Sequence, residues 1–398
     1  MDALFSNSST HTGDTPLRNA HRPSNVEEIR AILHQAKLQK TPIYIHRDSG
    51  QQGLHLVLTR MNKVLETDTA NLVAGVEPGV RLGDLSDALI EHRLRFVPAA
   101  TPFLREKTVG QFFYEGCSNI ASLKYGPAKH FLMGADILLP DGKLIKTGGK
   151  TVKNVTGYDL TRFMNGPYAN LGIPVKFLLK LLPEPEAKRL IIARFTCLED
   201  VFGMVDALRS ARIVPAYLFW FDPIVQSFIQ KAAIDDHLVL VEVDGVRDEL
   251  NDEWQAMDSA LRKSKSIMAA EAPADIPEIS SLTGLFNPEA GFSLVDELKL
   301  RYSDQPKFMD FFYGAPQKKT GIEGLFGQIA EGKIHAFYTG DPTGIDSWVE
   351  GVLMTAKEAG GFISGNYHRS LGKAPQDVLG QVEQTLKACV DPDGILMG

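Results

Sequence analysis

The sequence predicts an α+β fold in which a domain of two mixed lobes is followed by a second α+β domain built on an antiparallel sheet. Strand-like and helix-like segments alternate from Ser24 to Leu182. The alternation stops at Pro183-Glu184-Pro185-Glu186, where two prolines interrupt both helix and sheet patterns. Strand, helix and strand units with a different residue pattern then continue to about Thr339, which is typical of an α+β domain.

The 398 residues are enough for two or three domains at the usual domain size. We expect a flexible arm over 1–21, a first domain over 22–186, a second domain over 187–372 and a C-terminal segment over 373–398.

The first domain is predicted to open with a helix, because Ser24 and Glu27 form an S-x-x-E capping box before an apolar helical face. Further elements of this domain are expected as strands over 42–45, 54–59 and 71–77 and a helix over 82–92. The run from Gly134 to Thr147 indicates a hairpin with an Asp141-Gly142 turn.

The second domain shows fewer motifs. Its strands are predicted over 190–195, 217–221 and 238–243, the last ending before Asp244-Gly245, and its first helix over 198–209. Helices over 345–359 and 378–390 follow, and the chain closes with the sequence DPDGILMG.

Composition restricts the possible partners. The net charge of −7 argues against nucleic acid as the main partner, which requires a basic surface. The three cysteines, Cys117, Cys197 and Cys389, are far apart, which indicates a reducing compartment and too few thiolates for an iron–sulfur cluster. No apolar run approaches the roughly 20 residues of a membrane span, and the N-terminus lacks signal-peptide character. We therefore expect a cytoplasmic protein without a membrane span.

The segment from Gly148 to Ile173 combines glycine, asparagine and aspartate with apolar residues. Such spacing lets a backbone pass close to a ligand. Its first half, GGKTVKNVTGYDL, resembles FAD-binding oxidoreductases of the vanillyl-alcohol oxidase/PCMH superfamily, nearest to the D- and E-type FAD-binding subunits of glycolate oxidase. Three further segments are similar to sequence motifs of the same family: TRMNKVLETD, VEPGV and Lys124-Tyr125-Gly126.

The resemblance implies a PCMH-type FAD-binding domain, with FAD between its two lobes, followed by a cap domain and a C-terminal segment that returns to the FAD domain. The residues that it places at the cofactor are Arg47, Ser49, Gly50, Gln51, Thr108, Gly110, Gly116, Tyr125, Gly126, Gly157, Tyr158, Asp159, Gly172 and Ile173. Lys150 is a further source of positive charge for reduced flavin or a substrate carboxylate, or a solvated lysine.

Two segments depart from the family pattern. The expected pyrophosphate loop keeps only Gly50 and Gly53 as glycine. Phe112, Phe113 and Tyr114 stand where the family has small residues, which leaves two interpretations. Either an aromatic ring stacks on the flavin, or these rings fill space that a cofactor has vacated.

The function implied by the resemblance is oxidation of a 2-hydroxy acid of the glycolate or D-lactate type, with electrons passing to a separate iron–sulfur subunit and a D-type flavin subunit as a further partner. His335 is the candidate catalytic base and His368 the second candidate, although a lone histidine is more often structural, and the family's cap metal and acid–base motif is absent here. One alternative is a flavin-free structural subunit of a glycolate-oxidase-like complex. Another is a stand-alone D-lactate dehydrogenase.

Overall fold

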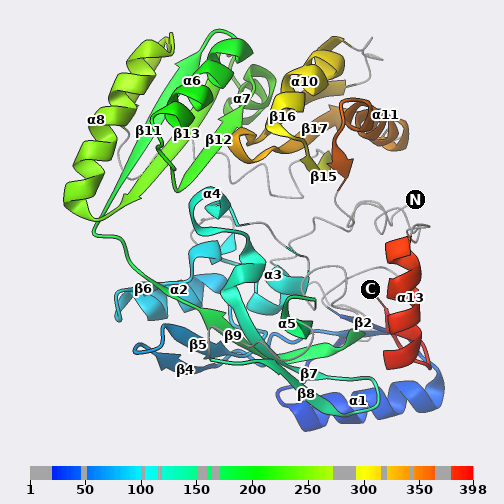
Figure 1. The fold of residues 1–398 in the computed structure, drawn as a ribbon. Coiled ribbons are helices and arrows are strands. Elements are labelled where there is room, and N and C mark those ends of the chain that lie inside the picture. Colours follow the sequence, from blue (N-terminus) through cyan, green and yellow to red (C-terminus); the bar gives the residue numbers. More distant parts are fainter. Residues whose placement is uncertain are drawn as a thin grey trace. The chain divides into compact units, whose positions relative to one another are not determined.

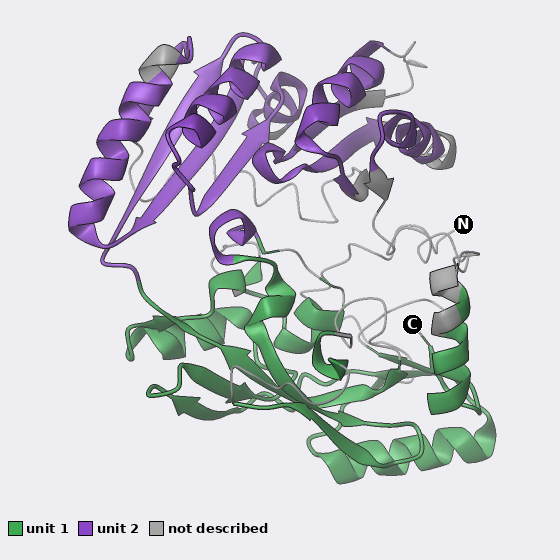
Figure 2. Cartoon of the chain, viewed as in Figure 1, with its two compact units in different colours: residues 1–119, 126–184, 368–398 green, residues 120–125, 185–367 purple. Residues whose placement is uncertain are grey.

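The structure is a computed structural model. It describes residues 20–45, 52–99, 104–114, 116, 119–150, 159–163, 171–271, 293–314, 321–340, 345–363 and 378–397. The chain forms two compact units (Figure 2). Unit 1 contains residues 1–119, 126–184 and 368–398, and unit 2 contains 120–125 and 185–367. The excursion of residues 120–125 into unit 2 was not predicted from the sequence.

The first lobe of unit 1 is a four-stranded parallel sheet (Figure 1). In spatial order its strands are β1 (Ala20–His21), β3 (Leu54–Leu56), β2 (Ile43–Ile45) and β19 (Leu396–Met397). Helix α1 (Val26–Gln39) buries Ile29, Leu33 and Ala36 in the same core as β2 and β3. Helix α13 (Val378–Val390) precedes β19, which pairs in parallel with β2.

The predicted capping box of α1 is wrong by one residue. Asn25 is the N-cap, and its side chain accepts a hydrogen bond from the Glu28 amide at 3.0 Å. The Glu28 carboxylate in turn accepts hydrogen bonds from the amide and hydroxyl of Ser24. Asparagine is as good an N-cap as the expected serine. The capping motif therefore begins one residue later than predicted. Glu27 forms an ion pair with Arg30 instead.

The second lobe of unit 1 is a five-stranded antiparallel sheet. Its spatial order is β4 (Val64–Asp68), β5 (Val73–Val76), β9 (Ile173–Lys180), β7 (Leu132–Leu138) and β8 (Leu144–Gly148). The predicted hairpin is confirmed, since β7 and β8 pair around a turn in which Gly142 has a φ of +83°. Leu138, Ile173 and Val175 share one core with α1 and β2, so the two lobes form one body.

Short elements connect the two sheets of unit 1. They are α2 (Leu82–Ile90), β6 (Leu94–Arg95), α3 (Val109–Tyr114), α5 (Leu160–Phe163) and β10 (Leu182–Pro183). Strands β6 and β10 pair with each other as a two-stranded ribbon.

Unit 2 is built on an eight-stranded sheet in which all neighbouring strands are antiparallel. The strands in spatial order are β14 (Met268–Glu271), β11 (Ala187–Phe195), β13 (His237–Gly245), β12 (Tyr217–Phe221), β16 (Gly321–Gln328), β17 (Lys333–Gly340), β15 (Ser293–Lys299) and β18 (Phe362–Ile363). This confirms the predicted antiparallel second domain. Its helices are α4 (Ser122–Tyr125), α6 (Leu198–Ser210), α7 (Pro223–Gln230), α8 (Arg247–Lys263), α10 (Gln305–Gly314) and α11 (Ile345–Glu358) (Figure 1).

One strand end in unit 2 differs from the prediction. Asp244 and Gly245 do not follow the strand but are its last two residues, opposite Lys188 and Ala187 of β11. The neighbouring strand β11 is as long as β13 and supplies partners to its end, which overrides the local turn preference of Asp-Gly.

Among the described helices, none has the length and apolar character that crossing a membrane requires.

Candidate functional site

The predicted pyrophosphate loop lies between β2 and β3. Arg47, Ser49, Gly50 and Gln51 are outside the described residues, but the strands at both ends of the loop fix where it begins and ends. β2 and β3 are parallel neighbours, with Ile43–Ile45 opposite Leu54–Leu56, so the loop connects the end of β2 to the start of β3. The loop leaves the carboxyl end of a parallel strand, which is the usual position for ligand-binding loops.

Gly53 has a packing role at the end of this loop. A Cβ atom on Gly53 would lie 2.7 Å from the Pro42 carbonyl oxygen and 2.7 Å from the Tyr44 ring. Only glycine allows the returning chain to pass this close to β2.

Thr108 and Gly110 form the start of α3. Thr108 and Gln111 make a reciprocal capping box, with amide-to-side-chain distances of 3.0 and 3.1 Å. The Gly110 amide donates to the Pro78 carbonyl at 2.8 Å. Gly116, with a φ of +66°, follows α3 and donates to the Phe113 carbonyl. These three residues therefore build a turn of fixed shape, and the amide of Gly110 is already engaged within the protein.

Phe112 and Phe113 are at most 1% exposed. The Phe113 ring stacks on Phe177 with centroids 5.3 Å apart, and Phe112 meets Phe113 edge to face at 5.1 Å. Phe96 and Phe131 complete the cluster. The rings contact one another in the core of unit 1, which favours the packing interpretation of these residues over a ring stacked on flavin.

The segment predicted to carry the cofactor begins at the end of β8. Gly148 has a φ of +64°, and a Cβ atom there would lie 2.0 Å from the Met133 carbonyl oxygen, so glycine is required. At Gly149, by contrast, no atom lies within 4 Å of the Cβ position. A side chain at Gly149 would therefore meet none of the described residues.

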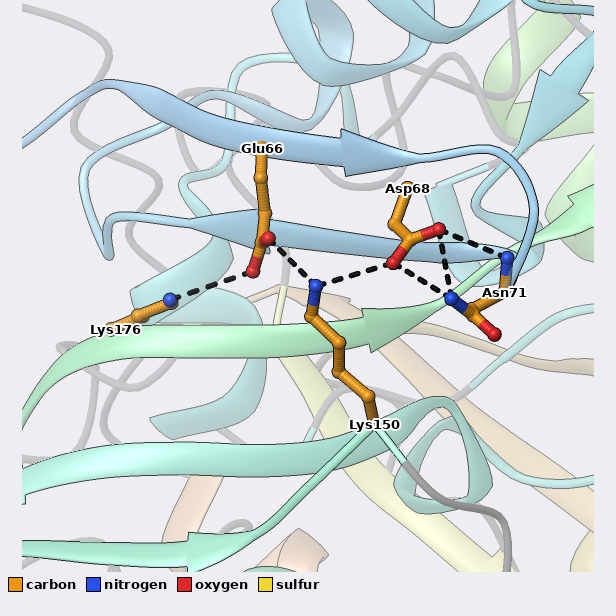
Figure 3. A network of polar contacts seen from close by, with 5 residues as sticks. All are labelled: Glu66, Asp68, Asn71, Lys150 and Lys176. Atoms are coloured by element: carbon orange, nitrogen blue, oxygen red, sulfur yellow. Dashed lines mark hydrogen bonds and ion pairs between the residues drawn. The ribbon is translucent and has the colours of Figure 1, made fainter.

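Lys150 lies in a network of charges on β4 and β9 (Figure 3). Its Nζ is 2.8 Å from Glu66 Oε2 and 3.2 Å from Asp68 Oδ2, and Lys176 lies 3.6 Å from Glu66. The hydrogen bond with Lys150 lowers the pKa of Glu66, and the hydrogen bond with Glu66 raises the pKa of Lys150. Two carboxylates thus compensate the Lys150 charge, so Lys150 is neither a free charge for a ligand nor a merely solvated lysine.

Beyond Lys150, Gly157 and Tyr158 lie outside the described residues. Asp159 caps the short helix α5, because its carboxylate accepts from the Arg162 amide at 3.1 Å. A Cβ atom on Gly172 would lie 2.5 Å from Ile137, and Ile173 is fully buried in the core shared by the two lobes. Gly172 and Ile173 therefore hold β9 against β7.

Tyr125 belongs to unit 2 and Gly126 to unit 1. The Tyr125 hydroxyl donates to Asp244 Oδ1 at 2.6 Å. Gly126 has a φ of +84°, and its carbonyl accepts a hydrogen bond from the Asn119 side chain at 2.8 Å. The glycine of the Lys-Tyr-Gly motif is thus required by its left-handed backbone.

His335 lies on β17 in unit 2, where it is half-buried. Its ring stacks on Phe326, with centroids 5.1 Å apart and planes 20° apart. Phe326 stacks on Phe221, which contacts Phe219, so His335 ends a row of aromatic rings across three strands. The described residues contain no group of His, Cys, Asp or Glu side chains that could hold a metal ion.

Sequence reasoning missed Asn119, Gln111 and Asp244. Gln111 follows Thr108 by three residues, a spacing that could have predicted the capping box. Asp244 acts through contacts distant in sequence, and no local pattern marks it or Asn119, whose partner is the Gly126 carbonyl. Residues 148–150 and 161 of the predicted segment come together, since the Cβ position of Gly148 lies 2.8 Å from Thr161 Oγ1.

Residues 19–148 match the protein family described as FAD binding domain. Glycolate oxidase subunit GlcD of Bacillus subtilis (strain 168) is 27% identical over 410 residues, which cover 94% of this chain and 86% of the relative. D-lactate dehydrogenase of Archaeoglobus fulgidus is 29% identical over 224 residues, covering 54% of this chain and 48% of the relative. The crystal structure of p-cresol methylhydroxylase with substrate bound has a TM-score of 0.76 at 17% identity, covering 95% of this chain and 87% of that one.

These comparisons confirm the resemblance expected from the sequence, and with it FAD as the cofactor. The likeness to p-cresol methylhydroxylase supports the fold alone.

Proposed function

The chain is an FAD-dependent oxidoreductase related to glycolate oxidase subunits and D-lactate dehydrogenases, and from this premise we propose that its substrate is a small 2-hydroxy acid. The observation that carries the proposal is the similarity to a glycolate oxidase subunit along 94% of the chain, which includes both units. The named substrates of the two relatives, glycolate and D-lactate, share a hydroxyl group on the carbon beside a carboxylate.

Oxidation of such a substrate removes a proton from the hydroxyl and a hydride from the α-carbon. Bound FAD supplies the two-electron acceptor for the hydride. His335 is our candidate for the group that takes the hydroxyl proton, because a histidine side chain titrates near neutral pH. Stacking on Phe326 restricts the orientation of its ring, which suits a base that must face one atom.

The residues that we propose to hold FAD come from four segments of the chain. They are Arg47, Ser49, Gly50 and Gln51 at the diphosphate, and Thr108, Gly110, Gly116, Tyr125, Gly126, Gly157, Tyr158, Asp159, Gly172 and Ile173 along the rest of the cofactor. The diphosphate residues follow the carboxyl end of the parallel strand β2 in the chain, which supports this placement.

We further propose that electrons leave on another protein. The chain has three separated cysteines, whereas an iron–sulfur cluster needs about four thiolates. We therefore propose an iron–sulfur subunit and a D-type flavin subunit as its partners. The names of its relatives, which are subunits of glycolate oxidase, support partners of this kind.

The proposal is tested by purifying the protein, identifying the released flavin, and assaying glycolate and both lactate enantiomers with an artificial electron acceptor. Turnover of one of these acids with FAD bound supports the proposal. A flavin-containing protein that oxidises none of them contradicts the substrate class. A protein that stays colourless after incubation with FAD would favour a structural subunit instead.

A further inference from the structure

Residues 120–125 leave unit 1 and are held by unit 2 at two points. At the first point, Gln328 Nε2 donates to the Ile120 carbonyl at 2.6 Å. The Ser122 hydroxyl donates to Glu331 and accepts from Lys333, and these two charged side chains are paired at 2.8 Å. Both are nearly buried, so this end of the segment is fixed by a compact polar cluster.

The second point is Asp244, whose side chain is fully buried. Lys124 Nζ lies 2.9 Å from Asp244 Oδ1 and also donates to the Asp244 carbonyl oxygen. The Tyr125 hydroxyl donates to the same Oδ1 at 2.6 Å. A buried carboxylate is costly unless it is paired and hydrogen-bonded, so Asp244 keeps Lys124 and Tyr125 in place while unit 2 is folded.

The flanking residues Asn119 and Gly126 belong to unit 1. The hydrogen bond from the Asn119 side chain to the Gly126 carbonyl joins the two ends of the excursion at 2.8 Å. Gly126 directly follows Tyr125 and has a left-handed backbone, and a Cβ atom there would lie 3.0 Å from His130 Nδ1. Two contacts therefore restrict the backbone at Gly126. Asn119 of unit 1 binds the Gly126 carbonyl oxygen, and Asp244 binds the side chain of Tyr125, the residue before Gly126.

We propose that Asp244 is a positioning residue for the cofactor, which acts through Lys124 and Tyr125 on the turn at Gly126. This inference rests on the proposed role of Tyr125 and Gly126 at FAD. Its consequence is that a side chain on the sheet of unit 2 helps to determine how tightly the FAD-binding unit holds its cofactor. Asp244 and the proposed FAD site are coupled in this way, because both act on the turn at Gly126.

The test compares Asp244→Asn with Asp222→Asn in the full-length holoenzyme. Asp222 is a matched control, because it is also a fully buried carboxylate of unit 2 that accepts from a tyrosine hydroxyl, in this case Tyr313 at 2.7 Å. Asp222 accepts hydrogen bonds from the Val225 and Leu325 amides and from the Tyr313 hydroxyl, and none of these residues lies within 120–125. The measured quantity is the rate at which FAD leaves the diluted holoenzyme, followed by the fluorescence of released flavin.

We expect Asp244→Asn to release FAD about tenfold faster, within the usual range of coupling between sites, and Asp222→Asn to release it at the wild-type rate. Equal rates for Asp244→Asn and wild type, or equal acceleration by both variants, would overturn the inference. Should Asp244→Asn not fold, Tyr125→Phe removes only the hydroxyl contact and must also accelerate release. Because no substrate is present, the result does not depend on whether the protein oxidises 2-hydroxy acids.

Discussion

Unit 1 and unit 2 present their functional residues in different ways. In unit 1 the described candidate residues lie at the ends of helices and strands, such as Gly110 in the first turn of α3 and Gly172 and Ile173 at the start of β9. In unit 2 they lie within long strands, such as His335 in the eight-residue β17 and Asp244 in the nine-residue β13. A cofactor held by backbone requires glycine at fixed spacings, which a sequence displays, whereas a single side chain within a strand leaves no such pattern.

The charged groups of the molecule also differ in how deeply they are buried. The Lys150 network of unit 1 is partly exposed, and solvent screens it. Asp222 and Asp244 of unit 2 are fully buried and depend on protein partners alone. Changes to the buried groups should therefore have larger effects than changes to the exposed network.

The largest effect is expected at His335. We expect His335→Asn to slow flavin reduction by a 2-hydroxy acid about 10²- to 10⁴-fold, the usual contribution of a general base. FAD content should stay at the wild-type level, because His335 is not among the residues that we propose to hold FAD. Stopped-flow measurement of flavin reduction decides this, and a rate within the error of wild type would remove His335 as the base.

The next effect concerns the C-terminal strand of unit 1. The fully buried Asp391 carboxylate accepts from the amides of Ile395 and Leu396 and pairs with Lys387 at 2.8 Å. We expect Asp391→Ala to lower the free energy of unfolding of unit 1 by about 3–5 kcal/mol, because it leaves two buried amides without their acceptor and removes the ion pair of the partly buried Lys387, which keeps its hydrogen bond to the Leu396 carbonyl. Urea denaturation measures this change.

The control for Asp391→Ala is Asp393→Ala, which removes the exposed ion pair with Lys37 two residues along the chain. Exposed pairs contribute little, so this variant should unfold close to wild type. A similar loss of stability in both variants would contradict the contrast between buried and exposed charge.

A smaller, pH-dependent effect is expected at Asp222. Burial raises the pKa of Asp222 to about 6, above its usual value. Between about pH 4 and pH 6 the folded state therefore binds a proton that the unfolded state has lost, so the stability contributed by Asp222 falls as pH rises, by up to about 3 kcal/mol. The difference in unfolding free energy between wild type and Asp222→Asn should follow this slope, and a difference that is flat from pH 4 to pH 7 would refute it.

The smallest effect is expected at Lys150. Because the Lys150 side chain is 43% exposed and solvent screens its charge, Lys150→Met should leave the reduction potential of the bound flavin nearly unchanged. A spectroscopic redox titration measures this potential. A clear shift to lower potential would mean that the Lys150 charge acts on the flavin after all.

The comparison of the units also explains what could be predicted from the sequence. The hairpin around Gly142 and the antiparallel sheet of the second domain were predicted, because turn residues and strand periodicity are local signals. The strand end at Asp244 and the excursion of residues 120–125 were not predicted, because the first depends on pairing with β11 and the second on the contacts of Lys124 and Tyr125 with Asp244, all distant in sequence. The cap of α1 was misplaced by one residue, because Ser24 and Asn25 are both good N-caps.

In the candidate site, the sequence identified where glycine is needed but not always why. Gly148 and Gly126 are required by left-handed backbone, whereas Gly172 and Gly53 are required by close packing. The sequence also placed Phe112 and Phe113 beside the flavin or in its place, and only tertiary contacts show that these rings pack on Phe96, Phe131 and Phe177.

The most direct test of the account is to mix the flavin-loaded protein with glycolate or D-lactate in the absence of oxygen and to record the visible spectrum. We predict that the absorbance of oxidised flavin disappears with one of these acids and persists with an acid that lacks the 2-hydroxyl group, such as propionate. An oxidised spectrum that does not change with any 2-hydroxy acid would contradict the proposed function.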